Sequence, residues 1–247
     1  MEQMPSNPPS METKPGPAGW LAVWIKAVTK PNEQTFVEIT ERPDAASRTA
    51  FIWVFIAGTI SGIFQAILQA IYAATGTSPR IPIPGLEQFT QTSGGHAGAM
   101  GITLIISLCL SPLAGVISVI FFALFTAIVQ WIAKLFGGAG SFNKLAYAFA
   151  AIMVPFTLAS SALALFTAIP FVGACLGILS FGLSLYGMVL NLMAVKGVNR
   201  FGWAPAIGSV FIPGLVVFIF CCCIVFAGAM LLGPVLGDAF KGLQFTP

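Results

Sequence analysis

Residues 145–195 read LAYAFAAIMVPFTLASSALALFTAIPFVGACLGILSFGLSLYGMVLNLMAV and contain no charged side chain. One transmembrane helix needs about 20 consecutive apolar residues to cross roughly 30 Å of hydrocarbon. The stretch is 51 residues long, with Pro170 and Gly173 near its middle, where both residues favour a turn. The sequence therefore predicts a helical hairpin, with one span at about 145–168 and a second at about 172–195.

The composition of the whole chain also indicates a membrane protein. Hydrophobic residues make up 57% of the 247 residues and charged residues only 8%, with a mean hydropathy of +0.93. Charged residues make up roughly a quarter of a typical soluble domain. The net charge of +3 is scattered, and no run of Lys and Arg forms the basic patch that nucleic acid binds. We therefore expect an all-α, polytopic bundle in a lipid bilayer, with no nucleic-acid partner.

Two other apolar stretches have the length of a single span. Residues 51–74 follow Ser47 and Arg48 and end at the polar stretch TGTSPR. Residues 205–232 begin with Pro205, which suits the first turn of a helix because that turn leaves its N–H groups unused. Each stretch predicts one further crossing.

A fourth stretch, residues 100–132, is too long for one crossing and too short for two comfortable ones. Pro112 divides it unequally, and proline inside a helix removes a hydrogen bond and clashes with the preceding turn. We predict a span at 113–132. We interpret residues 100–110 as a partial, re-entrant or interfacial segment, or as the tilted first half of a kinked helix.

The distribution of Lys and Arg favours five spans with a cytoplasmic N-terminus, because cytoplasmic loops carry the excess of basic residues. This topology leaves only Arg80 and Lys241 outside. It places nine basic residues in the cytoplasm: Lys14, Lys26, Lys30, Arg42, Arg48, Lys134, Lys144, Lys196 and Arg200. Two full spans within residues 100–132 would instead divide the basic residues six to five, which the rule disfavours.

Tryptophan positions agree with this topology. Trp53, Trp131 and Trp203 all fall at the cytoplasmic ends of their predicted spans. Amphipathic indole rings are enriched at the headgroup level of a bilayer. We therefore expect these three side chains to act as interfacial anchors.

The membrane domain is predicted to cover residues 50–233, with a tail on each side. Residues 1–18 hold five prolines among Ser, Asn and Glu, and such a composition buries too little apolar surface to offset the entropy of ordering. They contain no apolar core flanked by basic residues, so they do not resemble a signal peptide. We expect a disordered tail at 1–18 and a short C-terminal tail at 234–247.

Residues 19–49 form the predicted cytoplasmic segment, which opens with GWLAVWIKAVTK. Its apolar residues recur at helical spacing: Trp20, Leu21, Trp24, Ile25 and Val28. Lys26 and Lys30 occupy the other face, so the pattern predicts an amphipathic helix on the membrane surface, with both tryptophans and both lysines as interfacial anchors. The alternative is a helix packed against the protein's own cytoplasmic loops. Phe36 and Val37 are expected to return to the interface.

The glycine-rich turn GGAGS lies between Lys134 and Lys144. A nucleotide-binding P-loop requires GxxxxGK[ST], and this turn lacks the lysine. Gly137 and Gly138 can adopt the left-handed geometry that ends a helix, and Ser141 can cap the next helix. The two lysines then lie at headgroup level, where each adds roughly 1 kcal/mol of attraction to anionic lipid.

The five predicted spans contain no Asp, Glu, Lys, Arg or His. Proton relays, ion-coupled carriers and intramembrane proteases depend on such groups, so we expect a protein that is not an enzyme. Polar residues within the spans are Gln65, Gln69, Gln130 and Asn191. They are expected to form interhelical hydrogen bonds. The alternative is a channel or carrier for a small neutral solute that these four side chains line.

Two pairs of glycines form small-xxx-small patterns, Gly58 with Gly62 and Gly173 with Gly177. Such patterns let transmembrane helices approach closely, because glycine leaves no side chain between the two backbones. They predict helix packing within one monomer or, alternatively, the interface of a homo-oligomer.

No metal or cofactor is expected. The one histidine, His96, has no further ligands at the spacing that a zinc site needs. The five cysteines all lie in apolar runs, where free cysteine behaves as a small hydrophobe. Neighbouring residues of the CCC triplet point about 100° apart on a helix and cannot converge on one ion.

The stretch LFGGAGSFNKLAYAFAAIMVPF, residues 135–156, is followed by the predicted hairpin and resembles the Yip1-domain membrane proteins. The resemblance covers about residues 20–232, and its N-terminal part rests on Trp20, Val23, Trp24 and Pro31. Its most specific part is the GGxGSF turn with a proline inside the next span: Gly137, Gly138, Gly140, Ser141, Phe142 and Pro155.

The resemblance implies a multi-spanning helical protein with a cytosolic N-terminus. Eukaryotic members act in ER and Golgi membranes and bind prenylated Rab GTPases. This chain has a short cytosolic tail without an obvious docking segment and is more similar to prokaryotic members, so we do not carry Rab binding over. We expect an integral protein of the prokaryotic plasma (inner) membrane, or of the ER or Golgi membrane in a eukaryote.

These observations predict a non-enzymatic protein that organises lipid or partner proteins through its cytoplasmic amphipathic helix and basic loops. Its expected partners are the lipid bilayer and a second membrane protein or a further copy of itself.

Overall fold

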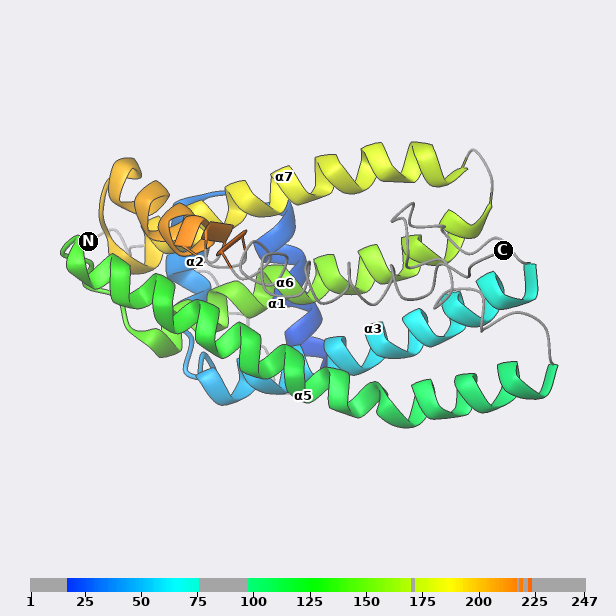
Figure 1. Ribbon diagram of the computed structural model, residues 1–247. Coiled ribbons are helices and arrows are strands. Elements are labelled where there is room, and N and C mark those ends of the chain that lie inside the picture. Colours follow the sequence, from blue (N-terminus) through cyan, green and yellow to red (C-terminus); the bar gives the residue numbers. More distant parts are fainter. Residues whose placement is uncertain (1–16, 76–96, 170–171, 217, 220–221, 224–247) are drawn as a thin grey trace, which may run out of the picture.

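The computed structural model describes residues 17–75, 97–169, 172–216, 218–219 and 222–223. These residues fold into helices, and the described part contains no β-strand (Figure 1). The helices are α1 (Pro17–Thr29), α2 (Glu33–Thr40), α3 (Ser47–Thr75), α5 (Ala97–Leu135), α6 (Phe142–Ala164), the 3-10 helix η1 (Leu165–Ala168) and α7 (Val172–Asn199). A shorter apolar helix covers Trp203–Val216. The predicted all-α class is confirmed.

Four helical segments are long and apolar enough to cross a membrane: Ser47–Tyr72, Leu104–Leu135, Phe142–Thr167 and Cys175–Asn199. Successive segments run in opposite directions along the bundle (Figure 1). The chain is therefore a multi-pass helical membrane protein, as the sequence predicts.

The fifth predicted span, 205–232, is described only in part. The helix Trp203–Val216 covers its first half. Most of its second half lies outside the described residues, as do the loop with His96, the predicted C-terminal tail 234–247 and nearly all of the predicted tail 1–18. The total of five crossings stays a prediction.

Helix α5 continues through Pro112, so residues 100–110 belong to the same helix as the predicted span at 113–132. The apolar segment begins at Leu104 rather than at residue 113. Pro112 has no N–H to donate to the carbonyl of Leu108, one turn earlier. The Ser111 hydroxyl donates to that carbonyl instead, at 2.8 Å. Such replacement by a neighbouring hydroxyl is what lets a transmembrane helix tolerate proline.

Small residues bring α3 and α5 close together. A Cβ on Gly58 would lie 2.7 Å from Ser118 Oγ, and one on Gly62 would lie 3.1 Å from Ser111 Cβ. From the other side, a Cβ on Gly115 would lie 2.3 Å from Thr59 Oγ1. Close approach of this kind stabilises helix pairs in lipid through van der Waals contact. The first glycine pattern therefore faces a helix of the same chain.

The second glycine pattern, on α7, has different surroundings. A Cβ on Gly173 would lie 3.0 Å from the Thr167 carbonyl oxygen, next to the turn that precedes α7. A Cβ on Gly177 would meet no described atom within 4 Å. Only the first of these glycines is tightly packed within the described part of the chain.

The best-packed part of the bundle is its charged end, defined here as the end where α1, α2, the start of α3, the α5–α6 turn and the end of α7 meet (Figure 1). Residues 145–152 at the start of α6 are all buried there. Many apolar side chains elsewhere on α5 and α7 point outward, among them Phe121 and Ile178. An outward apolar surface suits helices surrounded by lipid.

Candidate functional site at the charged end

Every ionic side chain that the structure describes lies in the segments of the charged end. Eight of them are basic, at Lys26, Lys30, Arg42, Arg48, Lys134, Lys144, Lys196 and Arg200. Four are acidic, at Glu33, Glu38, Glu41 and Asp44. The described residues at this end therefore carry a surplus of four positive charges. This concentration of charge makes it the candidate functional site.

Each of the four described carboxylates pairs with a basic residue. The pairs are Lys26 with Glu38 (2.5 Å), Lys196 with Glu33 (2.6 Å), Arg42 with Asp44 (3.0 Å) and Arg200 with Glu41 (3.0 Å). Partly exposed pairs of this kind are each worth about 0–1 kcal/mol. Their main effect is to join α1 to α2 and α2 to the end of α7.

Four basic residues remain after this pairing: Lys30, Arg48, Lys134 and Lys144. No carboxylate in the described ranges forms an ion pair with any of them. Lys30 and Arg48 flank α2 and its loop, whereas Lys134 and Lys144 flank the glycine-rich turn. Of the lysines predicted as anchors, only Lys26 pairs with a carboxylate in the described part of the chain.

Helix α1 turns its tryptophans toward the bundle. The rings of Trp20 and Trp24 meet the ring of Trp53 edge-on, at centroid distances of 5.8 Å and 5.5 Å. Trp53 is only 1% exposed, so its predicted role as an interfacial anchor is wrong. The outward apolar residues of α1 are Leu21 and Ile25, which are 55% and 53% exposed. The predicted apolar face is thus divided between the protein interior and the surface.

The other two tryptophans predicted as anchors, Trp131 and Trp203, are exposed. The Lys196 ammonium lies 4.7 Å from the centroid of the Trp203 ring, within the range of a cation–π contact. Their role as interfacial anchors stays a prediction.

Helix α2 packs into the protein rather than into the interface. Asn32 caps it, because the Asn32 side chain accepts a hydrogen bond from the Gln34 N–H at 3.2 Å. Phe36 and Ile39 are fully buried, so the predicted return of Phe36 to the membrane interface is wrong. On α7, a Cβ on Gly197 would lie 2.9 Å from the Glu33 carbonyl oxygen, which shows how closely the two helices approach.

The glycine-rich turn ends α5 as its sequence predicts, with Gly137, but not Gly138, in the left-handed region. Gly137 has a φ of 82°, the left-handed geometry that glycine adopts at little cost. Its N–H donates to the Lys134 carbonyl at 3.0 Å, and the Gly138 N–H donates to the Ala133 carbonyl at 2.9 Å. This pair of bonds is the Schellman motif. Ser141 then caps α6 by accepting from the Lys144 N–H at 3.4 Å.

Two buried amides fix the turn against the end of α7. Gln130 Nε2 donates to the Gly140 carbonyl at 2.9 Å and to Asn199 Oδ1 at 3.0 Å. The Ala139 N–H donates to the Asn199 carbonyl at 3.1 Å. A Cβ on Gly140 would lie 2.6 Å from Asn199 Oδ1, so only glycine leaves room for the amide. These hydrogen bonds hold the turn, with Lys134 and Lys144 on its two sides, against the end of α7.

Sequence reasoning did not find Asn199. Its signal is an amide residue directly after the last apolar turn of α7, followed by Arg200 in the left-handed region with a φ of 55°. The two remaining residues of the motif, Phe142 and Pro155, are partly buried. The Phe142 ring lies 6.3 Å from the Phe51 ring, and Pro155 lies within α6.

The four polar residues proposed to line a channel do not come together. Gln65 and Gln69 line a groove of about 410 Å³ between α3 and α5, beside a hydrogen bond of 2.8 Å between Ser161 and Ser61. Gln130 is bound to the glycine-rich turn, and Asn191 lies on α7. Only two of the four residues proposed to line a channel, Gln65 and Gln69, therefore lie at one place.

Comparison with known proteins identifies one family. The model of the Yip1 domain matches residues 25–225, which include α2 to α7 and the glycine-rich turn. No curated protein and no solved structure matches the chain.

Proposed function

Because the chain belongs to the Yip1 family of multi-pass membrane proteins, we propose that it acts without catalysis, as an organiser that gathers anionic lipid at its charged end. In this proposal the charged end faces the cytoplasm, and the protein resides in a prokaryotic plasma (inner) membrane. The observation that carries the proposal is the surplus of four basic side chains left after every described carboxylate has paired.

The arrangement of these charges supports lipid as the partner. Lys134 and Lys144 lie in the last and first turns of two helices that are long and apolar enough to span a membrane, so we expect them at the depth of the headgroups. A basic residue near an anionic membrane surface contributes about 1 kcal/mol of attraction. Four such residues at one end of the bundle attract anionic headgroups more strongly than zwitterionic ones. The exposed Leu21 and Ile25 on α1 add apolar contact at the same end.

Lipid enrichment around the reconstituted protein tests the proposal. All five tryptophans lie in the N-terminal segment or close to the ends of spans, so their fluorescence can be transferred to dansyl-labelled lipid nearby. Transfer to phosphatidylglycerol should exceed transfer to phosphatidylcholine at low salt. The excess should fall as salt is added, because surface charges are screened beyond about 10 Å at 0.1 M salt.

A pair of matched variants isolates the unpaired charges. The triple variant Lys30→Gln, Lys134→Gln and Lys144→Gln should remove most of the preference for phosphatidylglycerol. The double variant Lys26→Gln and Glu38→Gln removes one paired cation and its acid, so it leaves the net charge unchanged and should keep the preference. An undiminished preference in the triple variant would contradict the proposal.

A further inference from the structure

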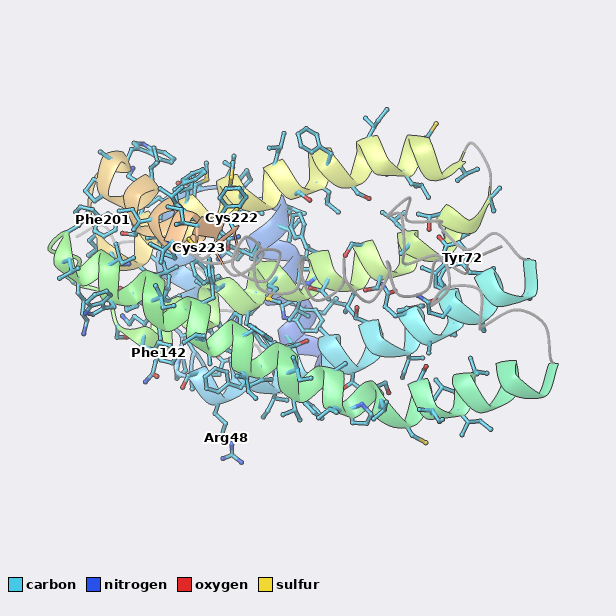
Figure 2. All side chains as sticks on the ribbon, in the orientation of Figure 1. Arg48, Tyr72, Phe142, Phe201, Cys222 and Cys223 are labelled. Atoms are coloured by element: carbon cyan, nitrogen blue, oxygen red, sulfur yellow. The ribbon has the colours of Figure 1, made fainter. Side chains whose placement is uncertain are left out.

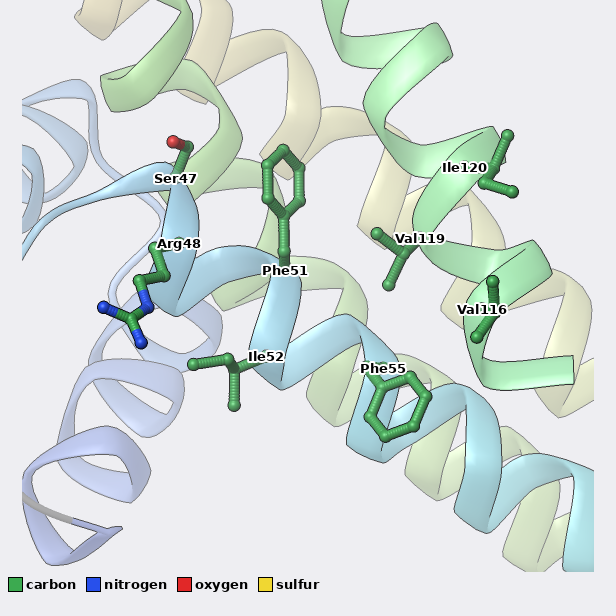
Figure 3. Close-up of a pocket in the computed structure, with 8 residues that line it drawn as sticks. All are labelled: Ser47, Arg48, Phe51, Ile52, Phe55, Val116, Val119 and Ile120. Atoms are coloured by element: carbon green, nitrogen blue, oxygen red, sulfur yellow. The ribbon is translucent and has the colours of Figure 1, made fainter. Parts of the chain in front are cut away.

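A groove opens on the outer surface of the bundle between α3 and α5, close to the charged end (Figure 3). Its volume is about 480 Å³. Apolar side chains form its walls: Phe51, Ile52, Phe55, Val116, Val119 and Ile120. Arg48 and Ser47 complete the lining at the end where α3 begins. The groove is thus apolar along its length and polar at one end only.

Arg48 is the charged group of this groove. Its side chain is exposed and projects away from the bundle (Figure 2). No carboxylate in the described ranges pairs with Arg48, because each of them already pairs with another basic residue. A guanidinium group presents a planar set of donors that fits the oxygens of a phosphate. The groove therefore has one end suited to a phosphate.

The spacing along α3 places the apolar wall directly beneath this charge. Phe51 and Phe55 follow Arg48 by three and seven residues, so all three share one face of the helix. The apolar span of α3 begins at Ser47, which puts Arg48 at the edge of the hydrocarbon and Phe55 about 10 Å further in. A molecule that occupies this groove meets a cation first and an apolar wall below it. That order matches a phospholipid.

The charge at one end of the groove favours an anionic lipid over a partner helix. A partner helix would have to supply an acid for Arg48 at the membrane edge, whereas an anionic lipid carries its phosphate at that depth.

We propose that the groove between α3 and α5 binds one anionic glycerophospholipid, with its phosphate on Arg48 and one acyl chain along Phe51, Phe55 and Val116. This site rests on the proposed function and makes it specific, since it is a single bound lipid rather than a general enrichment. The two can be told apart, because Arg48 is the only one of the four unpaired cations that lines the groove, whereas Lys30, Lys134 and Lys144 lie outside it.

Native mass spectrometry of the full-length protein in a mild detergent tests the site. Dioleoyl-phosphatidylglycerol and dioleoyl-phosphatidylcholine are added in turn, and bound lipids are counted per protein. We expect one retained phosphatidylglycerol and at least tenfold lower retention of phosphatidylcholine. Equal retention of both lipids would overturn the proposal. So would displacement of the retained lipid by millimolar inorganic phosphate, because a free phosphate lacks the acyl chain.

Variants at both ends of the groove define the mode of binding. Arg48→Gln should lower retention of phosphatidylglycerol at least tenfold, and Arg48→Lys should restore part of it. Val116→Trp fills the apolar part from an exposed position and should also release the lipid. The control Lys30→Gln removes an unpaired cation outside the groove and should leave the single bound lipid in place. Circular dichroism and size-exclusion chromatography confirm that each variant is folded.

The outcomes separate this site from the proposed function. Loss of the bound lipid in Arg48→Gln, with tryptophan transfer still dependent on the three lysines, supports both. If Arg48→Gln or Val116→Trp still retains one phosphatidylglycerol, the groove is not the lipid site. The enrichment is tested separately, by the triple lysine variant. In the triple lysine variant we expect the enrichment to be lost and the single lipid to stay bound, because the three lysines lie outside the groove.

Discussion

Gln130 on α5 donates a hydrogen bond of 3.0 Å to Asn199 at the end of α7, although 69 residues separate them along the chain. The same Gln130 amide also donates to the Gly140 carbonyl at 2.9 Å. All three groups are buried. One side chain therefore joins the end of α5, the turn between α5 and α6, and the end of α7.

Gln130→Leu is expected to destabilise the protein by about 1–3 kcal/mol, because it leaves two buried acceptors without a donor. The measurement is unfolding of the purified chain in mild detergent, followed by tryptophan fluorescence. The control is Gln65→Leu, since Gln65 is exposed and has no hydrogen bond of this kind among the described residues. If Gln130→Leu lowers the free energy of unfolding no more than Gln65→Leu does, the hydrogen bonds of Gln130 contribute nothing to stability.

The three glycines Gly140, Gly137 and Gly177 should respond differently to alanine. At Gly140 the new Cβ would lie 2.6 Å from Asn199 Oδ1 and 2.8 Å from the Val198 carbonyl oxygen, so the turn must move. At Gly137 there is open space, and the cost is the left-handed conformation alone, about 1–2 kcal/mol. At Gly177 alanine meets nothing described and should be neutral or slightly stabilising.

Midpoints of thermal unfolding rank these three variants. We expect the largest decrease for Gly140→Ala, a smaller one for Gly137→Ala and none for Gly177→Ala. The same midpoint for Gly140→Ala and wild type would mean that the amide of Asn199 can move aside freely.

The Ser111 hydroxyl is expected to stabilise the protein only while residue 112 is proline. In the wild-type chain Ser111→Ala leaves the Leu108 carbonyl without a donor, at a cost of about 1 kcal/mol. In a Pro112→Ala background the backbone N–H of residue 112 can donate to that carbonyl. The cost of Ser111→Ala should then be close to zero. A double-mutant cycle measures the difference, and equal costs in the two backgrounds would refute the compensation.

The predicted orientation can be tested by labelling single cysteines in intact cells with an impermeant maleimide. His96→Cys should be labelled from outside, and Ser141→Cys should be labelled only after the membrane is permeabilised. The described native cysteines at 109, 175, 222 and 223 lie in apolar segments, so the background should be low. Labelling at 141 but not at 96 in intact cells would reverse the topology.

The hairpin and the glycine-rich turn could be predicted from the sequence because their causes are local. The length of an uncharged stretch sets the number of crossings, and Gly137 and Ser141 each act within one helical turn. The fate of Trp53 and Phe36 was not predictable in this way. The interior of a membrane protein and the surrounding lipid are both apolar, so hydrophobicity does not tell one from the other. Only contacts with distant helices place these rings inside the bundle.

Local reasoning also missed two other features, the continuous helix through Pro112 and the role of Asn199. The sequence rule that proline breaks a helix ignores a hydroxyl one residue earlier that can replace the lost donor. The bond from Gln130 to Asn199 depends on how α5 and α7 are brought together, and no spacing along the chain encodes it. The candidate groove has the same origin, since Arg48 and Val116 belong to different helices.

The Tyr186 hydroxyl on α7 donates to the carbonyl of Val28 at 2.6 Å, at the last turn of α1. Together with the buried Val23 and Ala27, this bond fastens α1 to the membrane bundle. A load applied to the N-terminal helix is therefore transmitted to the middle of a transmembrane segment. A displacement of α1 therefore either tilts α7 with it or breaks this hydrogen bond and the packing of Val23 and Ala27.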